Sequence, residues 1–233
     1  MDLFYAADKT FEDLLNEKKN FVFIGEAGSG KSEIVLNTAY ILAKRFGKKV
    51  DLFDLDQTKP LYRSRDLKDA FEKEGVTIHF QEQFQDAPTQ VGGVVASLNG
   101  DGYTLLDIGG GQQAARMAGS YSNLLSKENS VPVYIVNPYR PWTKSVEAID
   151  VTMSHILNSI RLDHIYVLGN PNLGSETSVD EFAHGLDKID ELFDGLTVVN
   201  SACVRKDICE EAGKRTDKFL VPIELYLTYE WVD

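Results

Sequence analysis

The chain has 233 residues and a mass of 26.0 kDa, and 43% of its residues are apolar, which is enough to bury a large hydrophobic core. The formal net charge is -12 and the isoelectric point is about 4.8. This balance excludes unspecific binding to nucleic acid or to anionic lipid as a main function, since both need a basic surface. No apolar run approaches the ~18 residues of a membrane span. Residues 1–19 carry acids where a secretory leader is basic, so we expect a cytoplasmic protein.

The first predicted element is a short helix that begins near Thr10, where Asp13 forms a capping box, and ends at about Lys19. Short apolar runs rich in β-branched residues then alternate with longer segments of helical period. The predicted strands are 21–25, 50–55, 76–80, 103–109, 131–137, 164–170 and 196–202, and the predicted helices are about 31–46, 88–98, 112–126, 142–160, 177–193 and 205–214. The tail 219–232 could add an edge strand, although Pro222 counts against it.

The spacing of these elements predicts the fold class. Several strands are nearly continuous in apolar residues, as expected for a sheet that is covered on both faces. Because helices separate the strands regularly, we expect βαβ units and a three-layer, doubly wound α/β fold with a mostly parallel sheet of about seven strands. No repeat, low-complexity tract or linker divides the chain, so residues 1–233 are expected to form a single domain.

The segment 25–32 reads GEAGSGKS and fits the phosphate-loop pattern G-x-x-x-x-G-K-[ST]. It follows an apolar strand and opens an amphipathic helix, the context that this motif requires. A triphosphate must be wrapped by backbone N–H groups, which needs residues that tolerate unusual dihedrals and carry small side chains. Lys31 can reach the β- and γ-phosphates, and the Ser32 hydroxyl can bind Mg²⁺. All eight residues are therefore predicted to hold a nucleotide: Gly25, Glu26, Ala27, Gly28, Ser29, Gly30, Lys31 and Ser32.

Acidic residues end two further predicted strands. Asp107 closes the strand YTLLD and forms D-x-x-G with Gly110, so its carboxylate can hold Mg²⁺ while the Gly110 amide approaches the γ-phosphate. Asp54 and Asp56 close the strand VDLFDLD. Residues at i and i+2 of a strand share one face, so both could approach one metal ion or one water molecule. These three acids are candidates for metal binding and catalysis.

The remaining chemistry-bearing residues give no pattern. Cys203 and Cys209 are six apart, which is neither a CxxC redox motif nor a complete zinc set, and we interpret them as packing thiols. The four histidines are dispersed without metal-ligand spacing: His79, His155, His164 and His184.

With GEAGSGKS, DLDQTKP and LDIGG in this order, the chain resembles the P-loop NTPases of the MinD/ParA/CobQ group, in the SIMIBI class. The resemblance covers roughly residues 20–170. The group includes ATPases that act in septum placement, plasmid segregation, nitrogenase reduction and metallocentre maturation. The resemblance thus implies a Mg–ATP-dependent switch that hydrolyses ATP and acts on a protein client or as a homodimer.

The resemblance also implies roles for single residues. An acid in the second motif orients the attacking water, and Asp56 matches it, with Asp54 as the less favoured candidate. Asp107 corresponds to the Walker-type carboxylate. An asparagine after a later strand often contacts adenine, and here LGNPNLG offers Asn170, with Asn172 in reserve.

The identity of the base follows from chemistry. Guanine readers of the N/T-K-x-D type use an acid that accepts the N1 and N2 protons of guanine, and GNPN has neither that lysine nor that acid. An asparagine amide can pair with the adenine edge. ATP is therefore favoured over GTP.

The loop departs from the group at Glu26, where many members carry a lysine that reaches the phosphates of a partner subunit. A carboxylate near a triphosphate repels it, so dimerisation around the nucleotide cannot be carried over. Fast hydrolysis then needs another cation, and the candidates near the motifs are Lys59, Arg63, Arg65 and Arg116. We expect slow intrinsic hydrolysis that a partner or dimerisation accelerates.

Two other functions stay open. A P-loop kinase or ligase would transfer the phosphoryl group to a small acceptor, and a nucleotide sensor would bind ATP with little hydrolysis, consistent with Glu26. The acidic C-terminal residues 227–233 oppose a MinD-like membrane helix, and the net charge opposes ParA-like DNA binding.

Overall fold

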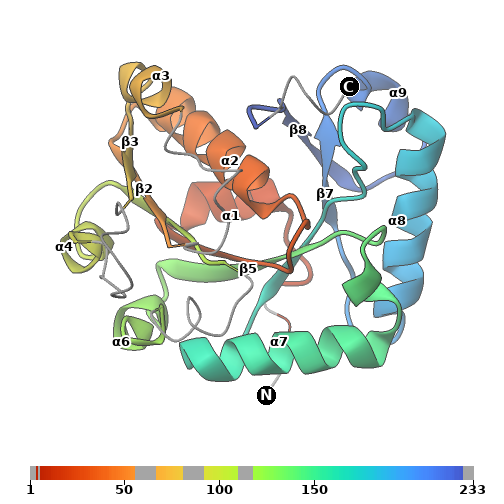
Figure 1. Cartoon of the computed structure of the whole chain (residues 1–233), viewed down its shortest axis with the longest axis horizontal. Helices are drawn as coiled ribbons and strands as arrows, with labels where there is room; N and C mark the ends of the chain where they lie inside the picture. Colours follow the sequence, from red (N-terminus) through yellow and green to blue (C-terminus); the bar gives the residue numbers. More distant parts are fainter. Residues whose placement is uncertain (1–3, 5, 56–66, 81–91, 110–117, 228–233) are drawn as a thin grey trace, which may run out of the picture.

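The computed structural model describes residues 4, 6–55, 67–80, 92–109 and 118–227. In this part of the chain, eight strands form one parallel sheet in the order β3-β2-β4-β1-β5-β6-β7-β8 (Figure 1). The strands are β1 (Asn20–Ile24), β2 (Val50–Asp54), β3 (Val76–His79), β4 (Tyr103–Asp107), β5 (Ser130–Val136), β6 (Tyr166–Gly169), β7 (Ser201–Arg205) and β8 (Phe219–Ile223). The predicted α/β class is confirmed, and the sheet has one strand more than the seven expected.

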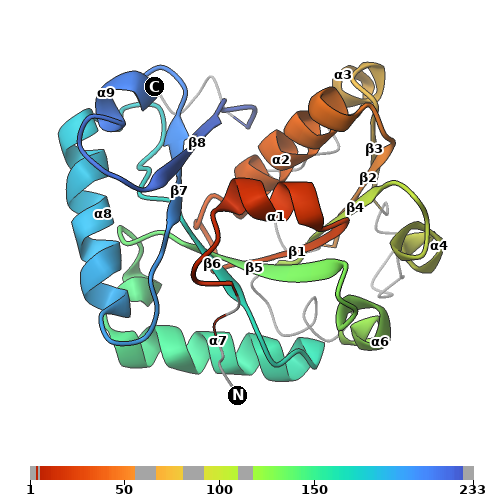
Figure 2. The same cartoon turned by 180° about the vertical axis from the view of Figure 1, so that it is seen from behind.

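Helices connect the strands and cover both faces of the sheet (Figures 1 and 2). They are α1 (Phe11–Glu17), α2 (Lys31–Phe46), α3 (Lys68–Lys73), α4 (Val94–Leu98), α6 (Ser122–Leu125), α7 (Val146–Ile160), α8 (Val179–Phe193) and α9 (Cys209–Ala212), with a 3-10 turn, η2, at Pro141–Thr143. None of the helices described is both long and apolar enough to cross a bilayer.

Successive side chains of β1 point to opposite faces of the sheet and pack in two separate core layers. Phe21 and Phe23 pack in the layer that holds α1 and α2, whereas Val22 and Ile24 pack in the opposite layer with residues of α4 and α7. Successive side chains of a strand point to opposite faces, so an unbroken apolar strand supplies both layers. The five residues of β1 are all buried, and β1 lies between β4 and β5 in the middle of the sheet, so the segment that follows it begins near the centre of the sheet edge.

The largest error of the strand predictions concerns β7. The apolar run LTVV suggested a strand at 196–202, but β7 spans Ser201–Arg205. Leu196 and Val198 are 47% and 62% exposed. They belong to the segment that leads to β7, so their side chains do not reach the core.

The helix bounds differ from the predictions where local signals override periodicity. Helix α2 has the predicted bounds, but α7 begins at Val146 instead of 142, because η2 precedes it and the Ser145 hydroxyl caps its first turn. Helix α3 was not predicted, and it has only six residues. Helices α4, α6 and α9 are shorter than expected, although residues 88–91 and 112–117 of those predictions lie outside the described residues.

The edge strand β8 is anchored to α2 by the segment that follows it. Asn37 of α2 accepts from Glu224 N and donates to Glu224 O, both at 2.8 Å. The Glu33 carboxylate accepts from the backbone N–H groups of Tyr226, at 2.9 Å, and Leu227. Burial raises the pKa of Glu33. Pro222 is tolerated because β8 lies at the edge of the sheet and pairs only with β7 among the described strands.

The anchor of β8 predicts the effect of Asn37→Ala. Asn37 is 5% exposed, and its loss leaves the N–H and C=O of Glu224 without these partners. We expect the free energy of unfolding, measured by urea denaturation, to fall by about 1–3 kcal/mol. The control is Asn99→Ala, at an exposed helix end, with an expected change within about 0.5 kcal/mol. Equal stability of Asn37→Ala and the parent chain would contradict the anchor.

Candidate nucleotide-binding site

The predicted phosphate loop lies between β1, which ends at Ile24, and α2, which begins at Lys31. Ser29 N donates to Glu26 O at 3.0 Å and closes a turn at the front of the loop. Gly30 caps α2 with φ +85°, a left-handed conformation, and a Cβ there would overlap the Asn170 amide, so position 30 requires glycine. The first N–H groups of α2 have no partner within the helix and carry the positive end of its dipole. The loop therefore has the backbone that an anion site needs.

Asn170, which follows β6, two strands from β1 in the sheet, holds this loop. Its Nδ2 donates to Ser29 O at 2.6 Å, and its Oδ1 accepts from Asn172 Nδ2 at 2.5 Å. Asn137 Nδ2 in turn donates to Asn172 O at 2.8 Å. All three asparagines are buried and follow the carboxyl ends of β5 and β6. The predicted site residue Asn170 thus lies at the loop, and its contact with adenine stays a prediction.

Lys31 and Asp107 form a buried ion pair. Their side chains are 2% and 3% exposed. Asp54 pairs in register with Asp107 on the neighbouring strand, so the two carboxylates face the same side of the sheet, toward α2. Taking charges out of water is costly unless they are paired, so the Lys31 ammonium stabilises the carboxylate end of β4. The structure therefore brings together three of the residues predicted for catalysis and metal binding.

Glu26 lies at the turn of the loop and is partly exposed. Burial, with a smaller contribution from the charge of Glu26, raises the pKa of Tyr134. A negative charge at this place works against a bound triphosphate, as the sequence indicated.

The residues described at the loop fit a Mg–nucleotide. The buried Ser29 hydroxyl has no hydrogen-bond partner in the described structure, which leaves a polar group for a ligand in the loop. Ser32 is partly exposed at the start of α2, and Asp107 closes β4. The described residues contain no group of three or more His, Cys, Asp or Glu side chains suited to a metal. The predicted magnesium ligands Ser32 and Asp107 would leave positions for phosphate oxygens and water, and Asp56, the third predicted ligand, lies outside the described residues.

Several predicted residues cannot be placed. Asp56 and Gly110 lie outside the described residues, as do the four candidate cations, Lys59, Arg63, Arg65 and Arg116. Their roles stay predictions.

One residue at the loop was missed by the sequence analysis. Arg140, in the connection after β5, donates from Nε to Gly28 O at 2.7 Å. Its place in the segment NPYRP, directly after a buried strand, is the signal that could have pointed to it, because residues after the carboxyl end of a parallel strand face the ligand edge.

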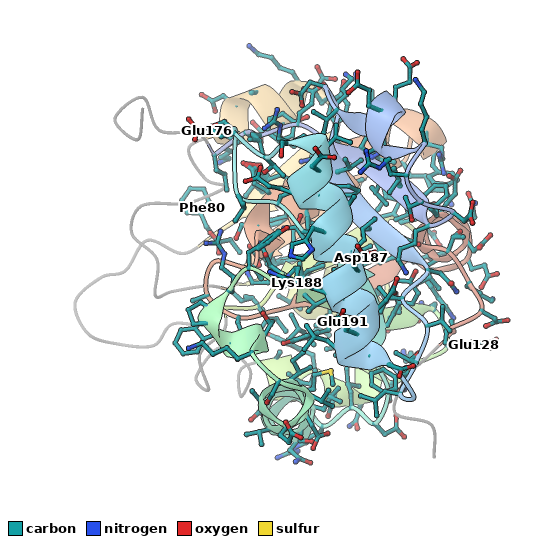
Figure 3. All side chains as sticks on the ribbon, turned by 90° about the vertical axis from the view of Figure 1, so that its right-hand side faces the viewer. Phe80, Glu128, Glu176, Asp187, Lys188 and Glu191 are labelled. Atoms are coloured by element: carbon teal, nitrogen blue, oxygen red, sulfur yellow. The ribbon has the colours of Figure 1, made fainter. Side chains whose placement is uncertain are left out.

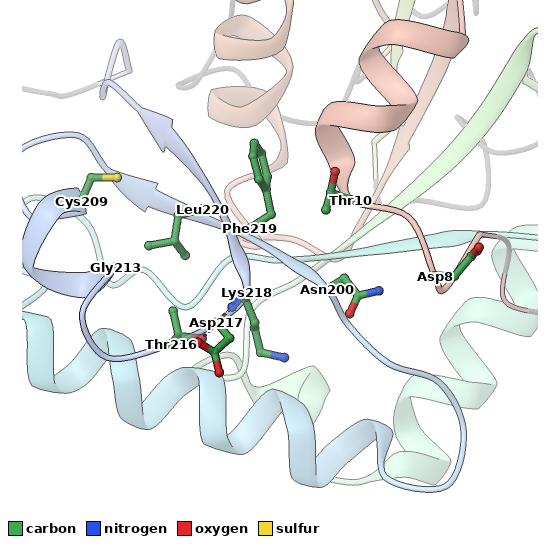
Figure 4. A pocket seen from close by; sticks show the side chains of 10 residues that line it. All are labelled: Asp8, Thr10, Asn200, Cys209, Gly213, Thr216, Asp217, Lys218, Phe219 and Leu220. Carbon is green, nitrogen blue, oxygen red and sulfur yellow. Dashed lines mark hydrogen bonds between the residues drawn. The ribbon is translucent and has the colours of Figure 1, made fainter.

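A separate cavity of about 660 Å³ lies elsewhere in the molecule (Figure 4). Its lining includes Asn200, just before β7, and Phe219 and Leu220, at the start of β8. In a parallel sheet all amino ends lie at one edge, so this cavity is at the edge opposite the phosphate loop. It does not belong to the nucleotide site.

The buried ion pair predicts a specific pattern of stability. Lys31→Ala and Asp107→Ala should each lower the free energy of unfolding without nucleotide by about 3–5 kcal/mol, because each leaves a buried charge without its partner. The double variant should lose less than the sum of the two, as measured by denaturant unfolding. The exposed pair Arg215–Asp180 is the control, and we expect a small interaction free energy between these two residues in the same double-variant comparison. Additive losses at Lys31 and Asp107 would contradict the pairing.

Comparison with known proteins supports the motifs. The family model of the CobQ/CobB/MinD/ParA nucleotide binding domain matches residues 21–170. No match was found among curated proteins.

Two solved structures of FtsY share the fold. FtsY from Thermotoga maritima is 14% identical with a TM-score of 0.50, and the match covers 80% of this chain and 66% of that chain. FtsY from Mycoplasma mycoides is 14% identical with a TM-score of 0.50, and the match covers 82% of this chain and 63% of that chain. FlhF complexed with GTP/Mg(2+) is 14% identical with a TM-score of 0.46, and the match covers 80% of this chain and 67% of that chain. This chain thus spans about two thirds of the length of the solved chains.

The matched residues contain the phosphate loop, the Lys31–Asp107 pair and Asn170. The chain belongs to the CobQ/CobB/MinD/ParA nucleotide-binding family, in the SIMIBI class of P-loop NTPases.

Proposed function

We propose that the protein is a Mg–ATP-dependent molecular switch that hydrolyses ATP. The proposal is supported by the loop 25–32, with its left-handed glycines and the helix terminus that follows it, and by the buried pair of Lys31 with Asp107. Anions are stabilised at a helix N-terminus by its free N–H groups and dipole.

The proposed reaction is hydrolysis of the terminal phosphoanhydride. The oxygen of a water molecule forms a bond to the γ-phosphorus, and the bond from that phosphorus to the β–γ bridging oxygen breaks. Its electron pair stays on the β-phosphate of ADP, and the proton of the water passes to a carboxylate or a phosphate oxygen. Asp56 is the residue proposed to orient the water, with Asp54 as the alternative, and magnesium, when bound, neutralises the charge on the phosphates.

The preference for ATP rests on the residues after β6. Asn170 and Asn172 offer amide groups, and the segment lacks the lysine and acid that guanine readers use. In the structure the Asn170 amide contacts the loop, so adenine recognition through Asn170 requires its second N–H or a side-chain rotation.

The switch itself is proposed to start at Lys31. Phosphates compete with Asp107 for the Lys31 ammonium, and a change of partner at the end of β4 acts on the segment that follows it. The segments 54–66 and 107–116 would respond to the γ-phosphate and transmit the change to a protein client or to a second copy of the chain. A metalloenzyme under assembly is one class of client consistent with the family.

Glu26 favours a second candidate function, an ATP sensor with little turnover. The carboxylate sits in the loop where a cation would help to stabilise the transition state. Phosphate release without an acceptor distinguishes the switch from the sensor.

The nucleotide site predicts the result of calorimetric titration. The parent chain with magnesium should bind ATP more tightly than GTP. Lys31→Ala should lower the affinity for ATP about 100-fold or more, because an ammonium contact to phosphate is lost. Lys44→Ala, at the exposed end of the same helix, is the control and should leave the affinity unchanged. Retained affinity in Lys31→Ala, or flat traces for both nucleotides with the parent chain, would refute the proposal.

A further inference from the structure

Arg140 fastens the connection after β5 across the phosphate loop. Its Nε lies 2.7 Å from Gly28 O, and an added Cβ at position 28 would lie 3.4 Å from the same nitrogen. Gly28 has φ +78°, so its carbonyl is oriented by a backbone conformation that glycine adopts easily. Because a guanidinium donates from a planar fork, Nε can hold the loop while Nη1 and Nη2 remain available for a second acceptor.

The connection that carries Arg140 is held in place on several sides. The Thr143 hydroxyl donates to Asn137 O and is within hydrogen-bond distance of Arg140 O, at 2.9 and 2.8 Å. Asn137 Oδ1 accepts from Tyr139 N at 3.0 Å. Arg140 itself is extended, with φ -101° and ψ 149°, as expected before Pro141.

The neighbouring helix α8 fixes the same connection. The Tyr139 hydroxyl donates to the Glu181 carbonyl, and the ammonium of Lys188 lies 4.8 Å from the centroid of the Tyr139 ring. Figure 3 shows Lys188 on α8. A Cβ at Gly185 would lie 2.9 Å from the Tyr139 ring, so the ring packs closely on the helix backbone. Arg140 is therefore positioned by packed elements and not by its own side chain alone.

The charged side chains near the loop differ in whether they have a partner of opposite charge. Lys31 is paired with Asp107, and the loop itself carries a further acid, Glu26. Within the described part of the chain, Arg140 forms no ion pair with a carboxylate. It is thus a cation at the loop whose charge is not already neutralised by these acids.

We infer that Arg140 supplies, from the same chain, the positive charge at the terminal phosphates that Glu26 does not supply. This inference rests on the proposed function. With Nε fixed on Gly28 O, the Nη groups donate to oxygens of the β- and γ-phosphates. The charge that develops on these oxygens as the bridging P–O bond breaks is then stabilised without a partner subunit.

The inference is tested with Arg140→Ala and Arg140→Lys in the full chain with magnesium. Removing a transition-state cation should lower kcat for phosphate release about 100-fold or more. Affinity for ATP should fall at most about tenfold, as for one lost charge-assisted contact, and affinity for ADP should stay within about threefold. Arg140→Lys should restore little, because an ammonium cannot hold Gly28 O and reach a phosphate together.

Arg215→Ala is the matched control, since Arg215 forms an exposed ion pair with Asp180. This variant should leave kcat and the affinities for ATP and ADP unchanged. The inference is refuted if Arg140→Ala retains kcat within about threefold of the parent chain. It is also refuted if the affinities for ATP and ADP fall together as strongly as kcat, which would indicate a role in loop shape only.

Failure of the proposed function gives a different result. If the parent chain binds ATP without turnover, the proposal that it hydrolyses ATP is wrong. The inference on Arg140 then requires that Arg140→Ala lower the affinity for ATP more than the affinity for ADP. If the parent chain binds neither nucleotide, both proposals fall.

Discussion

The ion pair between Lys31 and Asp107 joins the two halves of the site. It connects the first residue of α2 to the last residue of β4, and both side chains are almost fully buried. A buried ammonium is stable only with a partner of opposite charge, and so is a buried carboxylate. The same two residues are those that the family motifs assign to phosphate and magnesium. A ligand that replaced either partner would therefore change the contact between the first residue of α2 and the last residue of β4.

The parallel sheet explains why residues far apart in the sequence meet at this place. β1 lies between β4 and β5, so the loop after β1 has Asp107 on one side and the connection of Arg140 on the other. The next strand, β6, brings Asn170 under the loop. Ligands of open α/β sheets bind at the carboxyl ends of the strands, and the cavity at the amino ends of β7 and β8 is separate from this edge.

The sequence predicted the fold class and much of the sheet because the central strands are continuous apolar runs. Helix α2 has the predicted bounds, since a glycine-rich loop and Gly47 mark its two ends. The run LTVV misled the placement of β7, because apolar residues in a connecting segment resemble a strand until their burial is known. Arg140 was not predicted as a site residue, although its place after β5 puts it at the ligand edge of the sheet. Its contact with Gly28 spans 112 positions, and no local pattern reports such a distance.

The most direct test of nucleotide binding at this loop is a crystal structure with magnesium and a non-hydrolysable ATP analogue. We expect the triphosphate to lie on the amides of residues 25–32. The Lys31 ammonium should leave Asp107 for the phosphates, and Asp107 should face the cation. An analogue bound at another edge of the sheet, or bound at the loop with Lys31 still paired to Asp107, would contradict this expectation.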